Sequence, residues 1–154
     1  MISLFGNLSR RAWAASYEEE RKQPLELYEG RLEAAVSSIT FGAFDHSKLV
    51  GIVTVVRENK LKLRHRSNIV SMYVTKGFRE NGIGKALLEE ALQHVRKVYQ
   101  SEQLYLTVAS INKAAKTLYS SAGFEHFGTD TNALKIDDHY IDVDHMVLYL
   151  KYKE

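Results

Sequence analysis

The pattern of apolar and polar positions along the chain predicts that helices and strands alternate. Over residues 16–37, apolar residues recur among charged ones at helical spacing, and the helical pattern is interrupted near Pro24, the single proline of the chain. From residue 39 the pattern changes to two apolar runs, 39–44 and 49–56, which a short polar turn separates. This arrangement is typical of a β-hairpin, and the nearly continuous apolar character of its second arm indicates a strand covered on both faces.

The rest of the chain continues the alternation. Between residues 83 and 98, apolar residues follow the period of an amphipathic helix, with charged residues on the opposite face. The further elements that we expect are strands at 69–75 and 104–108, a helix at 112–122, and two final strands at 124–132 and 140–149. This order predicts an α/β fold with a mixed sheet and helices on its faces, and the length of 154 residues fits a single domain over 1–154.

Composition narrows the classes of function. Hydrophobic residues make up 45% of the chain and charged residues 26%, which is typical of a globular domain with a packed core. The formal net charge is only +2, which gives no indication of nucleic-acid or anionic-membrane binding. Cysteine is absent, which excludes disulfides, thiolate metal ligands and a cysteine nucleophile. The histidines lack metal-ligand spacing and no apolar run reaches the roughly 20 residues of a membrane helix, so we expect no metal and a cytoplasmic protein.

A glycine-containing loop between a predicted strand and a predicted helix carries the most information about function. Such a loop leaves backbone N–H groups unpaired at the positive end of the helix dipole, where a phosphate or pyrophosphate can bind. A glycine turn with solvated basic residues is the alternative. Gly77 and Gly82 have the spacing of a nucleotide-hydrolase phosphate loop, but Ile83 and Gly84 replace its Lys and Ser/Thr. Leu87 stands where a dinucleotide-binding loop needs its third glycine, so both of these classes are disfavoured.

The loop fits a different pattern, Arg/Gln-x-x-Gly-x-Gly/Ala, which residues 79–84 match at every fixed position. Here the chain resembles the GNAT superfamily of N-acetyltransferases, in which this loop binds the pyrophosphate of coenzyme A. The resemblance implies a mostly antiparallel sheet of six or seven strands that splays at the strand 66–75. It also implies that this strand and the loop bind acetyl-CoA. The residues concerned are Met72, Tyr73, Val74, Arg79, Glu80, Asn81, Gly82, Ile83, Gly84 and Lys85.

A second motif follows the next predicted strand. Residues 112–124 read Asn-x-x-Ala-x-x-Leu-Tyr-x-x-x-Gly-Phe, which is similar to the other acetyl-CoA motif of the superfamily. Asn112 and Tyr119 are seven residues apart, so they lie about two turns apart on one helix face and can both point into the cleft that would hold the thioester. The alternatives are that Asn112 only caps its helix and that Tyr119 only packs. The resemblance implies that both residues bind acetyl-CoA and that Tyr119 protonates the departing thiolate.

The resemblance implies transfer of the acetyl group of acetyl-CoA to a primary amine of a small molecule, peptide or protein, by direct attack. A free alkylamine has a pKa of about 10 and is mostly protonated at neutral pH, so a base or a water relay must remove its proton. Backbone N–H groups beside the strand residues Met72 to Val74 would stabilise the oxyanion. The alternative function is a domain that binds acetyl-CoA as a sensed ligand without turnover.

The general base is not identified by the sequence. Many members of the superfamily carry a glutamate on the strand before the phosphate loop, but residues 67–72 include no acid. Asp142, Asp144 and His145 on the last predicted strand could replace it, or could be solvated edge residues. A water chain is a third alternative.

The N-terminal part is short compared with the family pattern. Relatives place a strand and a full helix ahead of the segment that resembles residues 12–31, and here only residues 1–11 remain for both. We therefore expect at most a short edge strand at Leu4 and Phe5. We also expect an abbreviated or rebuilt N-terminal part of the sheet, on the half that selects the acceptor, which a partner subunit in a homodimer could complete. The acceptor amine itself cannot be read from the sequence.

Overall fold

The computed structural model describes residues 2–5 and 37–151. The strands are β1 (Ile2–Phe5), β2 (Ser38–Asp45), β3 (Lys48–Arg57), β4 (Arg66–Val74), β5 (Gln103–Ala109), β6 (Glu125–Ile136) and β7 (His139–Tyr149). The helices are α3 (Ile83–His94), continued by the π-helical segment η4 (Val95–Tyr99), and α4 (Lys113–Ser121), with 3₁₀ turns η2 (Leu61–Leu63) and η3 (Lys76–Phe78). Every strand and helix predicted between residues 39 and 149 is present. The helical prediction for 16–36 lies outside the described residues.

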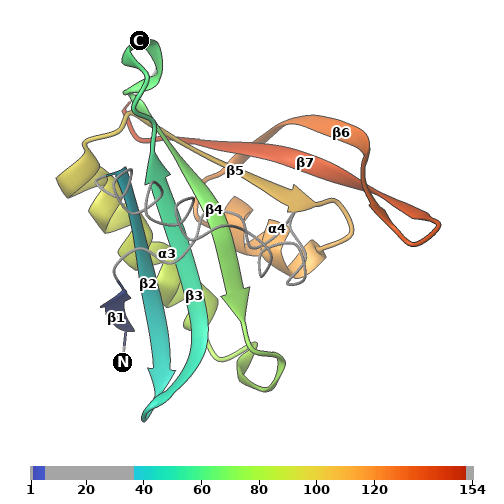
Figure 1. Cartoon of the computed structure of the whole chain (residues 1–154), viewed down its shortest axis with the longest axis horizontal. Coiled ribbons are helices and arrows are strands. Elements are labelled where there is room, and N and C mark those ends of the chain that lie inside the picture. The colour runs from blue at the N-terminus through green and yellow to red at the C-terminus, as the bar shows by residue number, and fades with distance from the viewer. Residues whose placement is uncertain (1, 6–36, 152–154) are drawn as a thin grey trace, which may run out of the picture.

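The strands form one seven-stranded sheet in the order β1-β2-β3-β4-β5-β7-β6. All neighbouring strands are antiparallel except β4 and β5, which pair in parallel. This confirms the mixed, mostly antiparallel sheet. β1 pairs along the outer edge of β2, as expected for a short edge strand at Leu4 and Phe5. At the other edge, β6 and β7 form a long hairpin (Figure 1).

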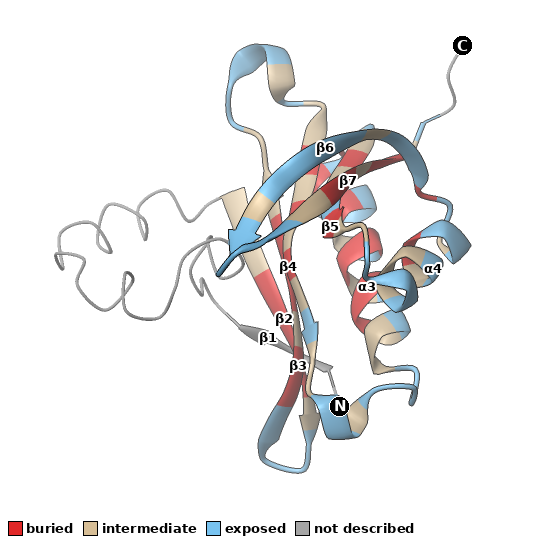
Figure 2. Ribbon diagram, turned by 90° about the vertical axis from the view of Figure 1, so that its right-hand side faces the viewer, coloured by how far each residue is buried: buried red, intermediate tan, exposed pale blue. Residues whose placement is uncertain are grey.

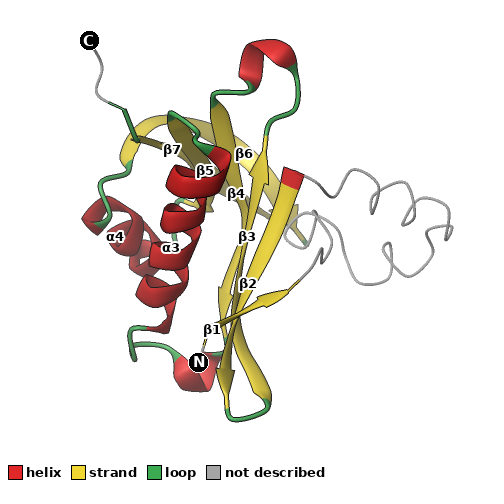
Figure 3. Cartoon of the chain, turned by 90° about the vertical axis from the view of Figure 1, so that its left-hand side faces the viewer, coloured by secondary structure: helices red, strands yellow, loops and turns green. Residues whose placement is uncertain are grey.

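Both described helices cover the same face of the sheet (Figures 2 and 3). The apolar stripe of α3 buries Leu87, Leu88, Ala91 and Leu92 in the hydrophobic core beneath the sheet. Whether helices also cover the opposite face, as predicted, depends on residues outside the described part of the chain. Within the described part, no helix is long and apolar enough to cross a membrane.

An irregularity in β4 bends the strand at the centre of the sheet. Consecutive residues of β3, Thr54 and Val55, pair with Ser71 and Ile69, so Val70 is an extra residue in β4. This arrangement is a β-bulge, which bends the strand that carries it and increases its twist.

The bend separates β4 from β5. The two strands pair only over Arg66–Asn68 and then diverge (Figure 1). Beyond Asn68, the edge of β4 that faces β5 has no partner strand in the described part of the chain. Its backbone N–H and C=O groups are therefore available to a ligand. The predicted splay at strand 66–75 is confirmed.

Candidate functional site

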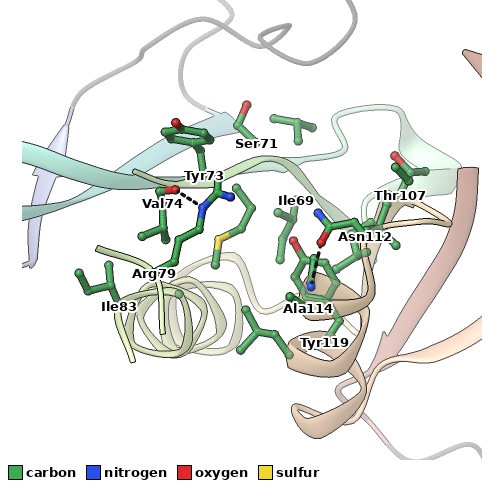
Figure 4. Close-up of a pocket in the computed structure, with 18 of the residues that line it drawn as sticks. Ile69, Ser71, Tyr73, Val74, Arg79, Ile83, Thr107, Asn112, Ala114 and Tyr119 are labelled. Carbon is green, nitrogen blue, oxygen red and sulfur yellow. Dashed lines mark hydrogen bonds between the residues drawn. The ribbon is translucent and has the colours of Figure 1, made fainter. Parts of the chain in front are cut away.

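A cleft of about 640 Å³ lies where β4 and β5 diverge. One wall is formed by β4, the loop after it and the start of α3, and the other by β5 and α4. Its apolar lining includes Met72 and Val74 from β4, Ile83 from α3 and Leu118 from α4. Figure 4 shows Ile83 on one side of the cleft and Tyr119 on the other. The two sequence motifs thus face each other across one cleft.

The loop before α3 has the backbone geometry of an anion-binding site. Glu80 and Gly82 both adopt left-handed conformations, with φ of 64° and 77°. Gly82 is the N-cap of α3, and the N–H of Ala86 donates to its carbonyl at 3.0 Å. The backbone N–H groups from Glu80 to Lys85 donate to no backbone carbonyl of the described residues. These N–H groups lie at the positive end of the helix dipole and can therefore bind an anion.

The two glycines at the start of α3 serve different purposes. A Cβ at Gly82 would meet no atom within 4 Å, so glycine suits its left-handed backbone and leaves open space beside the N–H groups. A Cβ at Gly84 would lie 3.3 Å from Cδ2 of Leu118 and 3.7 Å from Cε of Met72. Gly84 therefore lets α3 begin close to α4 and β4. Gly82 thus leaves room for an anion to approach the main chain, whereas Gly84 allows the close packing of the cleft walls.

The side chain of Arg79 spans from the loop to the end of β4. Its Nε donates to the carbonyl of Val74 at 2.9 Å, and its guanidinium carbon lies 5.7 Å from the centre of the Tyr73 ring (Figure 4). Because backbone groups of a strand point alternately to its two sides, Met72 and Val74 present theirs on the same side, toward the cleft. The Arg79 guanidinium thus places a positive charge beside this unpaired strand edge.

The other polar residues of the loop lie beside the cleft. Asn81 is exposed, and its Nδ2 donates to the carbonyl of Phe78 at 3.4 Å, which holds the loop against its own 3₁₀ turn. Lys85 is exposed on the first turn of α3 and is not part of the cleft lining. Its charge is therefore exposed to solvent on the first turn of the helix, and its predicted contact with acetyl-CoA stays a prediction.

Tyr119 and Asn112 both line the cleft from α4. Tyr119 is 5% exposed, and its ring meets Phe124 edge-on with centroids 5.8 Å apart. Burial raises the pKa of Tyr119 from 10.0 to about 12, so the phenol keeps its proton and can donate a hydrogen bond. Asn112 Oδ1 accepts a hydrogen bond from the N–H of Ala115 at 3.1 Å and caps α4. Packing and capping are therefore both observed, and neither removes these residues from the cleft.

Asp144 is tied into a structural network on the helix side of β7. Its carboxylate is 2.6 Å from Nζ of Lys116 on α4 and accepts a hydrogen bond from Thr129 of β6 at 2.7 Å. The hydrogen bonds from Lys116 and Thr129 hold the pKa of Asp144 well below its usual range. A carboxylate with so low a pKa is a weak base, and its charge is used to hold α4 against the β6–β7 hairpin.

The other two candidate bases are separated by the sheet geometry. Asp142 Oδ1 accepts a hydrogen bond from the N–H of Asn132 at 2.8 Å. Asn132 has a left-handed φ of 55°, so this hydrogen bond supports an irregular turn in β6. His145 follows Asp144 directly and points to the opposite face of the sheet, where its ring lies 5.9 Å from that of Phe127. Of the three candidates, His145 alone lines a second cavity, which lies on that face.

The structure adds Ser71 and Thr107, which the sequence motifs did not indicate. Both line the cleft at the point where β4 and β5 separate. Ser71 is 9% exposed, and its hydroxyl has no hydrogen-bond partner within the described residues. The only available signal was a hydroxyl residue inside an apolar strand, which does not reveal a site.

Comparison with known proteins identifies the protein family to which the chain belongs. Residues 5–124 match the model of the acetyltransferase (GNAT) family. The chain belongs to this family, and the resemblance drawn from its two motifs is confirmed.

Individual relatives agree with this class. A solved GNAT-family acetyltransferase from Streptococcus pneumoniae is 28% identical, with a TM-score of 0.72, over 90% of this chain and 79% of that one. An N-alpha-acetyltransferase of Sulfurisphaera tokodaii is 37% identical over 60 residues, which are 39% of this chain and 36% of the relative. A probable spermine N(1)-acetyltransferase of Bacillus subtilis subsp. natto is 31% identical over 65 residues, or 42% of this chain and 43% of the relative. The matches to these curated relatives thus span less than half of their length.

Proposed function

We propose that the protein transfers the acetyl group of acetyl-CoA to a primary amine of a small molecule, peptide or protein, by direct attack in a ternary complex. The family membership supports acetyl transfer. The observation that carries the proposal is the position of unpaired N–H groups at the start of α3 opposite the unpaired edge of β4, with Tyr119 facing the same cleft. Each of these parts matches a requirement of the reaction.

The binding requirements come first. A pyrophosphate at the loop would accept hydrogen bonds from the free N–H groups near Gly82, with the helix dipole behind them. From there, an extended amide-containing arm could pair with the backbone of Met72 and with the N–H of Val74 in the manner of an added strand, while Arg79 holds the Val74 carbonyl. This path leads from the loop to the bulge at Val70, a residue that lines both the cleft and the second cavity.

The chemical requirements follow from the direction of attack. As a neutral amine attacks the thioester carbonyl, negative charge develops on its oxygen, and an unpaired N–H of β4 near the bulge can stabilise that charge. The sulfur then leaves as a thiolate, and the protonated Tyr119 hydroxyl, which lines the same cleft, would donate a hydrogen bond to it. The amine proton must leave by a basic group or water on the acceptor side, and the imidazole of His145 lines the cavity on that side.

A direct test is a coupled assay of thiol release and product mass with acetyl-CoA and a panel of peptides, polyamines and amino acids. The proposal predicts amine-dependent release of CoA together with an acceptor that is heavier by one acetyl group. Acetyl-CoA binding without an acetylated product on any amine would instead favour the sensor function.

A further inference from the structure

A second cavity of about 530 Å³ lies on the face of the sheet opposite α3 and α4. It is formed by the end of β3, the first half of β4, the centre of β5, and β7. Both cavities are lined by Ile69, Val70, Leu106 and Thr107, so they meet where the sheet splays. An acceptor that enters from this face would therefore reach the thioester site at the bulge.

The second cavity contains a guanidinium that is held in place. The Cζ of Arg66 lies 3.7 Å from the centre of the Tyr105 ring, which is a close stacking contact. Tyr105 is fixed in turn, because its hydroxyl donates to Gln103 Oε1 at 2.7 Å and its ring meets Phe127 edge-on at 5.8 Å. A stacked guanidinium keeps its N–H groups in one plane and directs them sideways, where a carboxylate can bind two of them.

Arg66 has no acidic partner within ion-pair distance in the described part of the chain. Glu58 lies opposite Arg66 across the strand pair, since its N–H donates to the Arg66 carbonyl at 3.0 Å. The carboxylate of Glu58, however, accepts a hydrogen bond from Asn68 Nδ2 at 2.8 Å. The local acid is thus directed to an amide, and the guanidinium remains available to a ligand.

The loop above the cavity adds positive charge. Glu58 and Arg66 line the cavity, and the segment that joins them carries Lys60, Lys62 and Arg64, all exposed. These charges lie close together on a short loop, so their electrostatic potentials add at the cavity entrance within the Debye length of about 8 Å at physiological salt. A polycationic amine would be repelled from this entrance, whereas an acceptor that carries carboxylates would be attracted.

The spacing along β4 sets how far an acceptor carboxylate bound to Arg66 would lie from the acceptor amine that attacks the thioester. Tyr105 pairs with Asn68, so the guanidinium stacked on its ring lies near the level of Asn68. Val70 at the bulge is two residues further, roughly 7 Å along the strand. A free α-amino acid is too short to span this separation, because its amine and carboxylate are joined through one carbon. A side-chain carboxylate at the second or third residue of a peptide spans it.

We infer that the acceptor is the N-terminal amine of a peptide with an acidic residue at its second or third position, and that Arg66 binds this carboxylate. The inference rests on the proposed acetyl transfer and specifies its acceptor. Exposed Phe127, beside His145 on the cavity wall, offers an apolar surface for the first side chain of the peptide. Arg66 is thus a specificity-determining residue that touches the substrate far from the acetyl group.

The test is a comparison of two peptides with amidated C-termini that begin Ser-Glu-Glu and Ser-Gln-Gln, with acetyl-CoA at saturation. The enzyme variants are wild type, Arg66→Gln and the control Arg96→Gln, which removes an exposed charge at the far end of the α3 helix. In wild type and in R96Q we expect kcat/KM to be at least tenfold higher for the acidic peptide than for the amide peptide. The reason is that only the acidic peptide forms a charge-assisted hydrogen bond with Arg66. In R66Q, kcat/KM on the acidic peptide should fall at least tenfold, so that the two peptides become equivalent.

Three results would overturn the inference. R66Q lowering both peptides equally would make Arg66 a structural residue. Preference for spermidine or for free glutamate over both peptides would contradict the charge and spacing arguments. If no amine is acetylated, the proposed function fails, and calorimetric binding of the acidic peptide to the CoA complex still tests Arg66. In that case, equal binding to wild type and R66Q would refute carboxylate recognition.

Discussion

Replacing Tyr119 with phenylalanine tests the role of the buried phenol in the cleft. Burial raises the pKa of Tyr119 to about 12, whereas a thiol has a pKa of about 8.5, so complete proton transfer to the thiolate is uphill by roughly 3.5 units, or about 5 kcal/mol. Tyr119 should therefore stabilise the departing sulfur mainly as a hydrogen-bond donor. Loss of one hydrogen bond to a charged group costs about 1.5–3 kcal/mol, which corresponds to a roughly 10- to 150-fold slower chemical step.

The assay is the single-turnover rate of acetyl transfer, because product release can mask chemistry in kcat. The phenylalanine ring in Y119F would keep the edge contact with Phe124, so acetyl-CoA affinity and thermal stability should change little. Tyr99→Phe is the matched control, since Tyr99 is also a buried tyrosine, at 7% exposure, but lies at the end of the helical segment after α3. An unchanged single-turnover rate in Y119F, or an equal loss in Y99F, would contradict a role in catalysis.

Two further predictions concern the scaffold of the site. A Cβ at Gly51 would lie 3.0 Å from Cδ1 of Leu87. In a denaturant titration, Gly51→Ala should therefore lower the free energy of unfolding by about 1–3 kcal/mol. The control Gly128→Ala should be nearly neutral, because a Cβ there meets no atom within 4 Å. Asp144 has a lowered pKa in the folded chain, so its pairing with Lys116 stabilises the fold above about pH 4 and is lost as the pH falls further. In thermal unfolding, Asp144→Asn should therefore lower Tm at neutral pH and make Tm fall less steeply than in wild type as the pH is lowered. If Tm of the variant falls as steeply as that of wild type, the stabilising role of Asp144 is contradicted.

The sequence predicted most of the fold because local patterns and the tertiary structure agree. The apolar stripe of α3 and the alternation of strands after residue 38 both appear where periodicity placed them. The two glycine-containing motifs likewise predicted both walls of the cleft. The loop at Gly82 and the helix that begins after Asn112 owe their conformation to nearby residues, through a left-handed glycine and a capping side chain.

The rest of the site depends on contacts between distant parts of the chain. The bulge at Val70 is defined only by its pairing with β3, and nothing in an apolar strand sequence marks the extra residue. Residue type alone makes Asp144 a candidate base, but its contact with Lys116 on another element determines its charge and role. The stacking of Arg66 on Tyr105 joins strands that are separated by all of α3, so the sequence alone does not distinguish a site for an acidic partner at the basic residues 60–66 from a solvated strand end.

The most direct test of the central claim is calorimetric titration of acetyl-CoA into Gly82→Asp and Gly82→Asn. Both side chains tolerate a left-handed backbone, and a Cβ at Gly82 meets no atom within 4 Å, so the two variants differ mainly by one negative charge beside the free N–H groups. If the pyrophosphate binds there, repulsion of about 1 kcal/mol or more should weaken acetyl-CoA binding at least fivefold in G82D relative to G82N. Equal affinities in the two variants, with both folded, would show that the anion binds elsewhere and would contradict the account.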